Sequence, residues 1–233
     1  MIISGKNSVI ENLRAGKTFN KILISKSAFG FSEVVALAKE KGIKVEFLDR
    51  SILDKKAKNN QGIVAEIVDF VYSDLQTILD DERGLVVVLD GIEDPHNFGA
   101  IIRSCECAGV SGIIIPKHRA VPVNDTVIKT SAGAVANVNI CMVTNINNAI
   151  KELKENGFWV YGAEADGKVM YDCKLQGKTA FVIGSEGFGI SKLTKQNCDE
   201  VVSIPLCGKV NSLNASVACS IVLFEYVRQN FGK

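Results

Sequence analysis

Residues 181–187 read Phe-Val-Ile-Gly-Ser-Glu-Gly, an apolar strand that runs directly into a loop of small residues. The same arrangement occurs at 85–103, Leu-Val-Val-Val-Leu-Asp-Gly-Ile-Glu-Asp-Pro-His-Asn-Phe-Gly-Ala-Ile-Ile-Arg, and at 203–217, Ser-Ile-Pro-Leu-Cys-Gly-Lys-Val-Asn-Ser-Leu-Asn-Ala-Ser-Val. Glycine lets a backbone approach a ligand closely, because it has no Cβ atom. The three loops indicate backbone packed around a small ligand. The polar residues beside that ligand would be Asn97, Arg103, Glu186 and Asn214.

The pattern around these loops predicts an α/β fold with a parallel sheet. Near-continuous apolar strands are predicted at 85–89, 112–115, 138–142, 158–163, 179–183 and 200–204. Helices are predicted between and after them at 98–108, 125–131, 146–155, 190–196 and 213–229. Apolar strands separated by helices are typical of a parallel sheet buried on both faces. Such sheets bind ligands beyond the carboxyl ends of their strands, where all three small-residue loops are expected.

Residues 1–70 follow a pattern of their own and predict a small α/β domain. Its helices are predicted at 7–15, 32–41 and 51–58, and its strands at 21–25, 43–48 and 63–68. Residues 71–83 are polar and acidic and are predicted to be a linker with a helical turn, so that the second domain covers 84–233. The first 70 residues carry twelve lysines and arginines against eight acidic residues, although the whole chain has a net charge of only +1. This mild basicity is compatible with nucleic acid and equally with an ordinary solvated surface.

The composition indicates a globular protein without a membrane segment or a metal. The chain of 233 residues is 47% hydrophobic, and no apolar run approaches the roughly 18–20 residues of a membrane span. The N-terminus lacks the basic and apolar regions of a signal peptide, so a cytoplasmic location is expected. Seven cysteines without a Cys-x-x-Cys pair, and only two histidines, argue against zinc and are typical of reduced thiols.

Two widespread nucleotide-binding motifs are absent from the sequence. The segment 187–189, Gly-Phe-Gly, lacks the third glycine of the Gly-x-Gly-x-x-Gly fingerprint, and no Gly-x-x-x-x-Gly-Lys-Ser/Thr loop occurs. A Rossmann dehydrogenase and a P-loop NTPase are therefore disfavoured.

The polar residues near the loops have structural explanations as well as functional ones. Arg103 is either a surface arginine of an amphipathic helix or a guanidinium that reaches the ligand and binds a phosphate. Asn97 and Asn214 stand near predicted helix starts, where asparagine commonly caps. Glu186 lies in a glycine-rich loop, and a carboxylate in such a position favours a ligand contact.

Three motifs resemble, in order, those of the SpoU/TrmH-type ribose methyltransferases of the SPOUT superfamily. Motif 1 is 94–103, Asp-Pro-His-Asn-Phe-Gly-Ala-Ile-Ile-Arg, and motif 2 is 183–189, Ile-Gly-Ser-Glu-Gly-Phe-Gly. Motif 3 joins 204–206, Ile-Pro-Leu, to 211–218, Asn-Ser-Leu-Asn-Ala-Ser-Val-Ala. Residues 130–134 also resemble a family segment between motifs 1 and 2.

The first domain resembles the RNA-binding domain of the branch that methylates a guanosine of 23S ribosomal RNA. The resemblance lies at 5–9, Gly-Lys-Asn-Ser-Val, and at 60–65, Asn-Gln-Gly-Ile-Val-Ala. Two positions depart from the family pattern: Leu206 stands where methionine is common, and Asn60 where histidine is common. The first is an apolar exchange of similar size, and the second weakens the assignment to this branch.

The resemblance implies a C-terminal parallel sheet with a deep trefoil knot, preceded by a small α/β RNA-binding domain of a kind found in ribosomal proteins. It implies that a homodimer uses S-adenosylmethionine to methylate a ribose 2′-hydroxyl of RNA, most closely a guanosine of 23S rRNA or its precursor. A tRNA ribose methyltransferase is the nearer alternative. A non-catalytic RNA-binding or ribosome-assembly protein with the same fold is the alternative from another class.

The resemblance also implies roles for individual residues. The catalytic residues would be Asn97, Arg103, Glu186 and Asn214. The cofactor-binding residues would be Thr130, Gly133, Gly184, Gly187, Ile204, Leu206, Ser212 and Leu213. Because arginine stays protonated in proteins, Arg103 is expected to hold a phosphate and stabilise a developing alkoxide rather than to take a proton. The dimer would use an apolar face of the last helix, formed by Val217, Ile221, Val222 and Tyr226.

Overall fold

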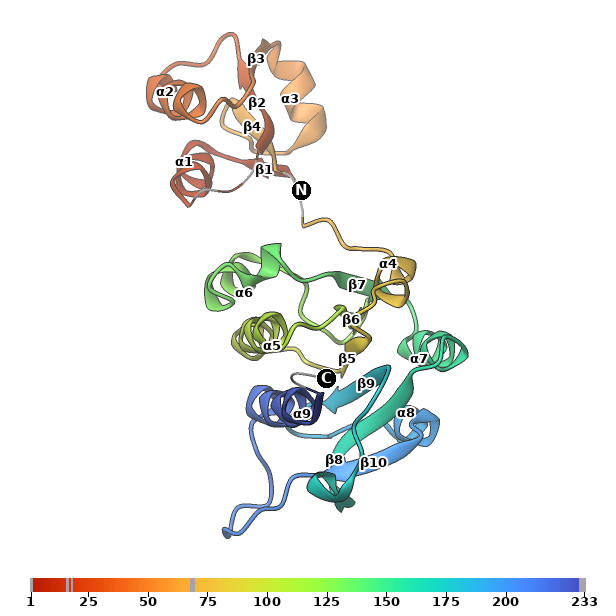
Figure 1. The fold of residues 1–233 in the computed structure, drawn as a ribbon. Coiled ribbons are helices and arrows are strands. Elements are labelled where there is room, and N and C mark those ends of the chain that lie inside the picture. Colours follow the sequence, from red (N-terminus) through yellow and green to blue (C-terminus); the bar gives the residue numbers. More distant parts are fainter. Residues whose placement is uncertain (1, 16, 18, 68–69, 231–233) are drawn as a thin grey trace. The chain divides into compact units, whose positions relative to one another are not determined.

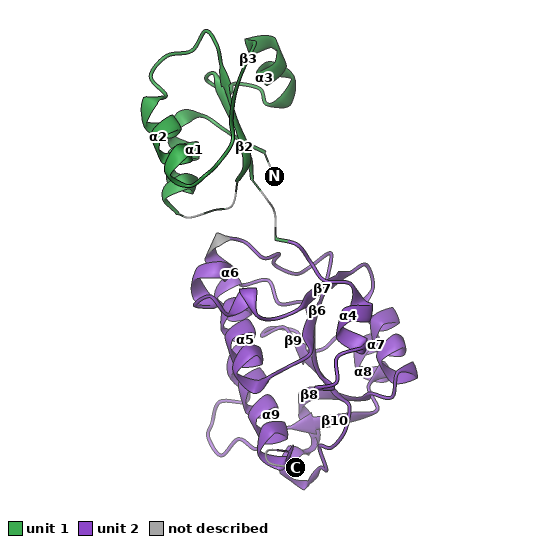
Figure 2. Ribbon diagram, turned by 45° about the horizontal axis from the view of Figure 1, so that its top comes forward, with its two compact units in different colours: residues 1–70 green, residues 71–233 purple. Residues whose placement is uncertain are grey.

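The chain forms two compact units, residues 1–70 and residues 71–233 (Figure 2). The computed structural model describes residues 2–15, 17, 19–67 and 70–230. Residue 68, the last of the predicted strand 63–68, lies outside these ranges. Within them, every helix is too short or too polar to cross a lipid bilayer.

The first unit is a four-stranded mixed sheet with helices on both faces. Its strands, in sheet order, are β1 (Ile2–Ser4), β4 (Ile63–Ile67), β2 (Phe19–Ser25) and β3 (Val45–Leu48). Its helices are α1 (Lys6–Arg14), α2 (Ser32–Glu40) and α3 (Arg50–Lys56). Along β2 the side chains alternate between faces: Ile22 and Ile24 join the larger core cluster, and Leu23 packs with Leu53 of α3. The sequence predicted every element except β1, which is too short for a recognisable pattern.

The second unit is built on six parallel strands. In sheet order they are β10 (Glu200–Ser203), β8 (Trp159–Val169), β9 (Thr179–Gly184), β5 (Leu85–Asp90), β6 (Gly112–Pro116) and β7 (Ile140–Val143). Every pairing is parallel, so the loops after all six strands lie at one edge of the sheet. The predicted parallel sheet is confirmed, and β8 extends six residues beyond the predicted strand 158–163.

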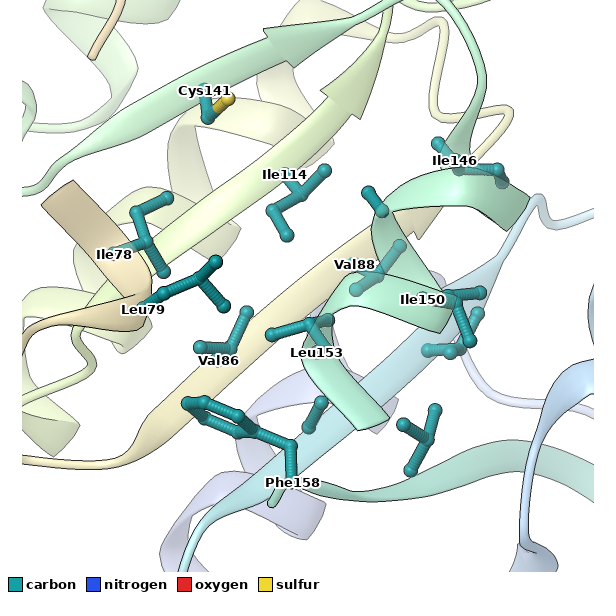
Figure 3. Close-up of a cluster of buried hydrophobic side chains, with 14 of the residues drawn as sticks. Ile78, Leu79, Val86, Val88, Ile114, Cys141, Ile146, Ile150, Leu153 and Phe158 are labelled. Carbon is teal, nitrogen blue, oxygen red and sulfur yellow. The ribbon is translucent and has the colours of Figure 1, made fainter. Parts of the chain in front are cut away.

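Helices cover both faces of this sheet (Figure 1). One face carries α5 (Pro95–Ala108), α6 (Asp125–Thr130) and α9 (Ala215–Asn230), and the other carries α4 (Leu75–Leu79), α7 (Ile146–Glu155) and α8 (Lys192–Asn197). Two short 3-10 turns occur at Ala134–Ala136 and Met170–Asp172. Figure 3 shows the apolar cluster beneath α4 and α7. Its buried members are Ile78, Leu79, Val86, Val88, Ile114, Cys141, Ile146, Ala149, Ile150, Leu153, Phe158, Val160, Ala180, Val182 and Ile190.

The segment 71–83, expected as a linker, takes part in this core through α4. Ile78 is fully buried, and a Cβ atom at Gly112 would lie only 2.5 Å from its Cδ1 atom. The backbone of Ser73 also donates to the carbonyl of Ile140 over 2.8 Å. Residues 71–83 therefore pack as part of the second unit. The acidic character of the segment concealed its two buried apolar residues.

The last helix returns from the sheet edge to its middle. After the edge strand β10, residues 204–214 bring the chain back so that α9 packs on α5, where the hydroxyls of Ser104 and Ser220 lie 2.7 Å apart. This return past the loop after β9 is the connectivity that the expected knot requires.

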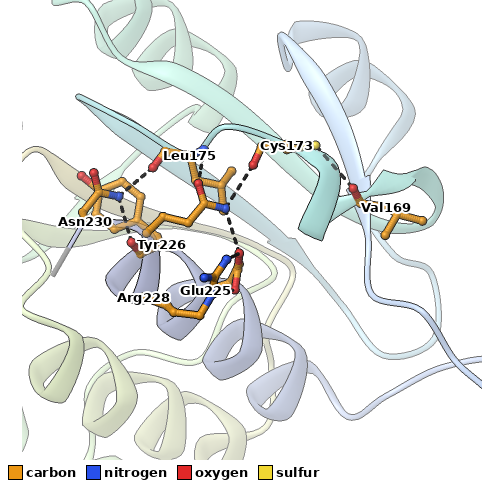
Figure 4. A network of polar contacts seen from close by, with 8 residues as sticks. Val169, Cys173, Leu175, Glu225, Tyr226, Arg228 and Asn230 are labelled. Atoms are coloured by element: carbon orange, nitrogen blue, oxygen red, sulfur yellow. Dashed lines mark hydrogen bonds and ion pairs between the residues drawn. The ribbon is translucent and has the colours of Figure 1, made fainter.

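The far end of α9 is tied to the segment between β8 and β9 (Figure 4). The Gln229 side chain donates to the carbonyl of Cys173 over 3.1 Å and accepts from the backbone of Leu175 over 3.0 Å. Asn230 donates to the carbonyl of Leu175 over 2.6 Å. These bonds fix the direction of the helix, whose first turn then lies at the carboxyl edge of the sheet.

Candidate active site

Three side chains from three separate strand ends meet at the carboxyl edge of the parallel sheet. Asn97 donates from Nδ2 to Oε1 of Glu186 over 3.0 Å, and Asn214 donates from Nδ2 to Oδ1 of Asn97 over 2.9 Å. Asn214 also donates to the same carboxylate oxygen of Glu186. These are three of the four predicted catalytic residues, and the structure brings them into one hydrogen-bonded cluster.

Asn97 is free for this contact because a neighbouring residue caps its helix. The carboxylate of Asp94 accepts from the backbone N–H groups of His96 and Asn97 over 3.2 Å and 3.1 Å, and Pro95 occupies the first helical position. The capping role considered for Asn97 is therefore wrong. Its side chain projects from the first turn of α5 toward Glu186.

Asn214 combines a structural role with its place in the cluster. Its Oδ1 atom accepts from the backbone N–H groups of Ser216 and Val217 over 2.9 Å and 3.3 Å, which caps the start of α9. Its Nδ2 atom faces the other way, toward Asn97 and Glu186. The Asn214 amide thus caps α9 through its oxygen and orients the Glu186 carboxylate through its nitrogen.

The loop that carries Glu186 is a tight backbone turn held by two carboxylates. Ser185 and Gly189 exchange backbone hydrogen bonds of 3.2 Å and 2.9 Å. Glu164 of β8 accepts from the backbone N–H of Ile190, and Asp90 at the end of β5 accepts from that of Ser191 over 2.8 Å. Sequence analysis did not identify Glu164 and Asp90. Their only signal was a carboxylate at or near the end of an apolar strand run.

Two glycines of this turn leave no room for a side chain. A Cβ atom at Gly184 would lie 2.1 Å from the carbonyl carbon of Gly189. At Gly189, which has a φ of 65°, a Cβ atom would lie 2.4 Å from the carboxylate of Glu164. Bare backbone at these positions is therefore a requirement of the turn.

Arg103, the fourth predicted catalytic residue, lies outside the cluster. It is exposed on α5, whose buried face is formed by Phe98, Ile101, Ile102 and Cys105. Within the described residues its guanidinium has no hydrogen bond and no ion pair. Within the described residues, Glu186 accepts from the two amides and not from Arg103.

A cavity of about 210 Å³ adjoins the cluster on the side of β8, β9 and β10. Its lining includes five of the eight predicted cofactor residues: Gly184, Ile204, Leu206, Ser212 and Leu213. Further apolar lining comes from Ala163, Ile183, Val202, Ala215 and Ala218. The cavity is a largely apolar cleft whose polar lining residues are Glu164, Ser185, Glu186, Asn211 and Ser212.

The other three predicted cofactor residues do not line this cavity. Thr130 donates to the carbonyl of Thr126 over 2.8 Å and packs against α5, where a Cβ atom at Gly99 would lie 1.8 Å from its Oγ1 atom. Gly133 has a φ of 88° in the turn after α6. Thr130 is therefore engaged in helix packing, and Gly133 is required by the turn. Gly187 lines a different cavity.

That second cavity, of about 610 Å³, adjoins the cluster toward β5, β6 and β7. It shares Ser185, Glu186 and Gly189 with the first cavity, so Glu186 borders both. The rest of its lining is largely polar and comes from the loops after four strands: Asp90, Gly91, Ile92, Glu93, Asp94, Asn97, Pro116, His118, Arg119, Thr144, Asn145, Ile146, Asn147, Gly187, Phe188, Ser191 and Thr194.

The residues that line the two cavities include no cysteine. Two thiols elsewhere in the second unit, those of Cys141 and Cys198, have a pKa that burial raises to about 11. Among residues 2–15, 17, 19–67 and 70–230, no three His, Cys, Asp or Glu side chains are grouped as metal ligands. The chemistry available at the cluster is that of a carboxylate oriented by two amides.

Comparison with known proteins assigns the family. Residues 84–224 match the SpoU rRNA methylase family. The chain belongs to this family. Residues 2–72 of this SpoU family protein match a domain described as RNA 2′-O ribose methyltransferase substrate binding. The resemblance found in the sequence is confirmed, and membership makes the protein an RNA methyltransferase.

Similar proteins cover nearly the whole chain of this SpoU family member. It is 43% identical over 238 aligned positions to a Staphylococcus haemolyticus protein assigned to the TrmH family of tRNA/rRNA methyltransferases, covering 98% of this chain and 96% of that protein. The structure of an AdoMet-bound rRNA methyltransferase from Sinorhizobium meliloti matches with a TM-score of 0.68 at 25% identity, covering 99% and 88%. The SpoU methyltransferase AviRb from Streptomyces viridochromogenes, in complex with AdoMet, shares the fold with a TM-score of 0.69 at 23% identity, covering 100% and 91%.

Replacement of Asn214 separates its two roles. Serine caps a helix about as well as asparagine but is too short to reach Glu186, whereas alanine does neither. We expect Asn214→Ala to lower the free energy of unfolding by about 1 kcal/mol, and Asn214→Ser to leave it within about 0.5 kcal/mol of the wild-type value. Urea denaturation of both variants measures the difference. A serine variant as unstable as the alanine variant would mean that the contact with Glu186, not the cap, stabilises α9.

Proposed function

We propose that the protein transfers a methyl group from S-adenosylmethionine to a ribose 2′-hydroxyl of RNA. The observation that carries the proposal is the cluster of Asn97, Glu186 and Asn214, which borders two cavities. A methyl donor in one cavity and an RNA nucleotide in the other would meet at Glu186. Transfer between two bound groups needs such an alignment, because their proximity supplies much of the rate enhancement.

The lining of the smaller cavity supports its assignment to the methyl donor. Ile183, Ile204 and Leu213 supply apolar surface of the kind that an adenine ring contacts. The bare backbone at Gly184 lets main-chain groups approach the ligand, because a side chain there has no room. Leu206, where the family commonly has methionine, keeps the wall apolar. We infer that these residues, with Ser212, hold S-adenosylmethionine.

The residues of the cluster act on the ribose hydroxyl. When bound, S-adenosylmethionine supplies an electrophilic methyl group on a sulfonium, which is a good leaving group. Both amides donate to Oε1 of Glu186, so within the described residues its Oε2 atom has no hydrogen-bond partner and is free to accept from the hydroxyl. Asn97 and Asn214 fix the orientation of the carboxylate. Arg103, exposed and without a hydrogen bond or ion pair in the described chain, would hold an RNA phosphate.

We propose a guanosine of 23S ribosomal RNA as the target. Support comes from the first unit, which matches a substrate-binding domain, and from the segments 5–9 and 60–65. The relatives are assigned to tRNA or rRNA, so a tRNA target is the alternative. An RNA substrate together with free thiols favours work in the cytoplasm.

Mass spectrometric mapping of ribose methylation in RNA from cells with and without the protein tests this function. We expect one 2′-O-methylguanosine to disappear from 23S rRNA. A site lost from tRNA instead would favour the alternative substrate. No lost site, together with no binding of S-adenosylmethionine, would favour a non-catalytic RNA-binding protein.

The last helix supports a homodimer, with a different set of residues from that expected. Val222 is fully buried within its own chain, and the hydroxyl of Tyr226 donates to the carbonyl of Gly177 over 2.9 Å. Val217 and Phe224 are 47% and 46% exposed, and together with Ile221 they form a stripe at helical spacing. We propose that this stripe pairs two copies of the chain.

Sedimentation velocity should give a dimer for the wild type and a monomer for Phe224→Asp, because a carboxylate in the stripe would oppose its burial. A dimeric Phe224→Asp would contradict the assignment of this stripe to the dimer interface.

Binding of S-adenosylmethionine should distinguish two glycines of the motif 2 loop. At Gly184 a Cβ atom would collide with the backbone of Gly189, whereas at Gly187 nothing lies within 4 Å. We expect Gly184→Ala to weaken binding at least about tenfold, because the loop must shift, and Gly187→Ala to bind within about twofold of the wild type. Isothermal titration calorimetry compares them. Equal binding by both variants would show that the turn between Gly184 and Gly189 is not part of the cofactor site.

Arg103→Lys should lose most of the methyl-transfer activity, at least about tenfold, although the positive charge remains. Lysine lacks the planar fork that binds a phosphate through two parallel hydrogen bonds. Steady-state transfer from tritiated S-adenosylmethionine to RNA measures the loss, and calorimetry should show unchanged cofactor binding. Near-normal turnover in this variant would refute the geometric role of the guanidinium.

A further inference from the structure

The larger cavity has the chemical character of a nucleotide site. Its volume is about 610 Å³, and it adjoins the cluster on the side away from the proposed cofactor cavity. Four of its lining residues are acidic: Asp90, Glu93, Asp94 and Glu186. Glu93 has no hydrogen bond or ion pair within the described residues, so it is free to accept from the N–H groups of a base. Carboxylates would repel a phosphate, so a base fits the interior and a phosphate does not.

The positive groups of this cavity come from the loop after β6. His118 and Arg119 line the cavity, are exposed, and have no ion pair within the described residues. Arg119 has a φ of 54°, a left-handed conformation that residues other than glycine rarely adopt. The backbone of Val121 is bonded to the carbonyl of Ile92 over 3.0 Å, which ties this loop to the one that follows β5. A phosphate beside the bound base would meet these two side chains.

Phe188 adds an aromatic ring to the same cavity. It belongs to the turn between Ser185 and Gly189, directly beyond Glu186, and its side chain is 96% exposed. A ring so exposed contributes nothing to the apolar core of its own chain. Single-stranded RNA is commonly bound through bases that stack on aromatic side chains. Phe188 and Glu186 are two residues apart, so a stacked base would bring its own ribose near the carboxylate.

We propose that the larger cavity takes the acceptor nucleotide, turned out of its RNA stack, with Phe188 stacking on the base and His118 and Arg119 at the adjoining phosphate. The proposal rests on the proposed function and deepens it, because it assigns the binding site of the acceptor. Enzymes that modify a nucleotide within RNA or DNA often extrude it in this way. The ring then selects for an unstacked nucleotide without reading sequence.

The test compares Phe188→Leu, Phe188→Trp and the wild type. Leucine keeps apolar bulk and lacks the ring, whereas tryptophan keeps a ring that stacks. Trp159→Ala is the matched control, because Trp159 is 51% exposed at the amino end of β8, the opposite edge of the sheet. The substrate is total RNA from cells lacking this protein, at a concentration below saturation, with tritiated S-adenosylmethionine as the donor. Calorimetry measures cofactor binding for each protein.

We expect Phe188→Leu to lower kcat/KM for RNA by about 10- to 100-fold, in line with the loss of one stacked base. Phe188→Trp should stay within about threefold of the wild type, Trp159→Ala should be unchanged, and all four proteins should bind the cofactor equally. A fully active leucine variant would overturn the proposal. So would a leucine variant that loses cofactor binding, because Phe188 would then support the other cavity. A wild type that transfers no methyl group to any RNA would instead refute the proposed function, and this inference with it.

Discussion

A single carboxylate oxygen, Oε1 of Glu186, joins segments that lie far apart in the chain. Asn97 and Asn214, 117 residues apart, both donate to it. The contact exists because parallel strands end at one edge and because the last helix returns to that edge from β10. Gln229 and Asn230 fix the far end of this helix, and Asn214 caps its start. The geometry of the carboxylate therefore depends on the whole C-terminal path and not on the motif 2 loop alone.

Much of the second unit could be predicted because its strands are short apolar runs, five of which stop before glycine, proline or an acidic residue. The rule that parallel sheets bind ligands beyond their carboxyl ends was enough to bring Asn97, Glu186 and Asn214 to one place. Local patterns failed where the deciding contact is distant in sequence. Thr130 packs closely against Gly99 of α5, and Ile78 of α4 packs closely against Gly112 of β6. Local periodicity reveals neither of these contacts.

Arg103 illustrates a different limit of sequence reasoning. Its spacing from Asn97 correctly put both residues on one helix, but helical geometry turns the guanidinium toward solvent while Asn97 faces Glu186. Asp90 and Glu164 show the reverse case. Each reads as an ordinary polar residue at a strand end, yet their carboxylates hold the backbone of Ile190 and Ser191. Every residue except proline has a backbone N–H group, so the identity of the donor residue does not reveal such a hydrogen bond.

The two cavities that share Glu186 differ in the residues that line them. The smaller one depends on bare backbone at Gly184 and Gly189 and on aliphatic walls, so an apolar exchange such as Leu206 for methionine preserves it. The larger one is lined by side chains from the loops after four strands, including Phe188 and Arg119. Loops that carry contacts through side chains accept substitution without disturbing the strands beneath. We therefore propose that binding of the methyl donor and selection of the RNA nucleotide depend on separate parts of the site, and that Glu186, which lines both cavities, belongs to each part.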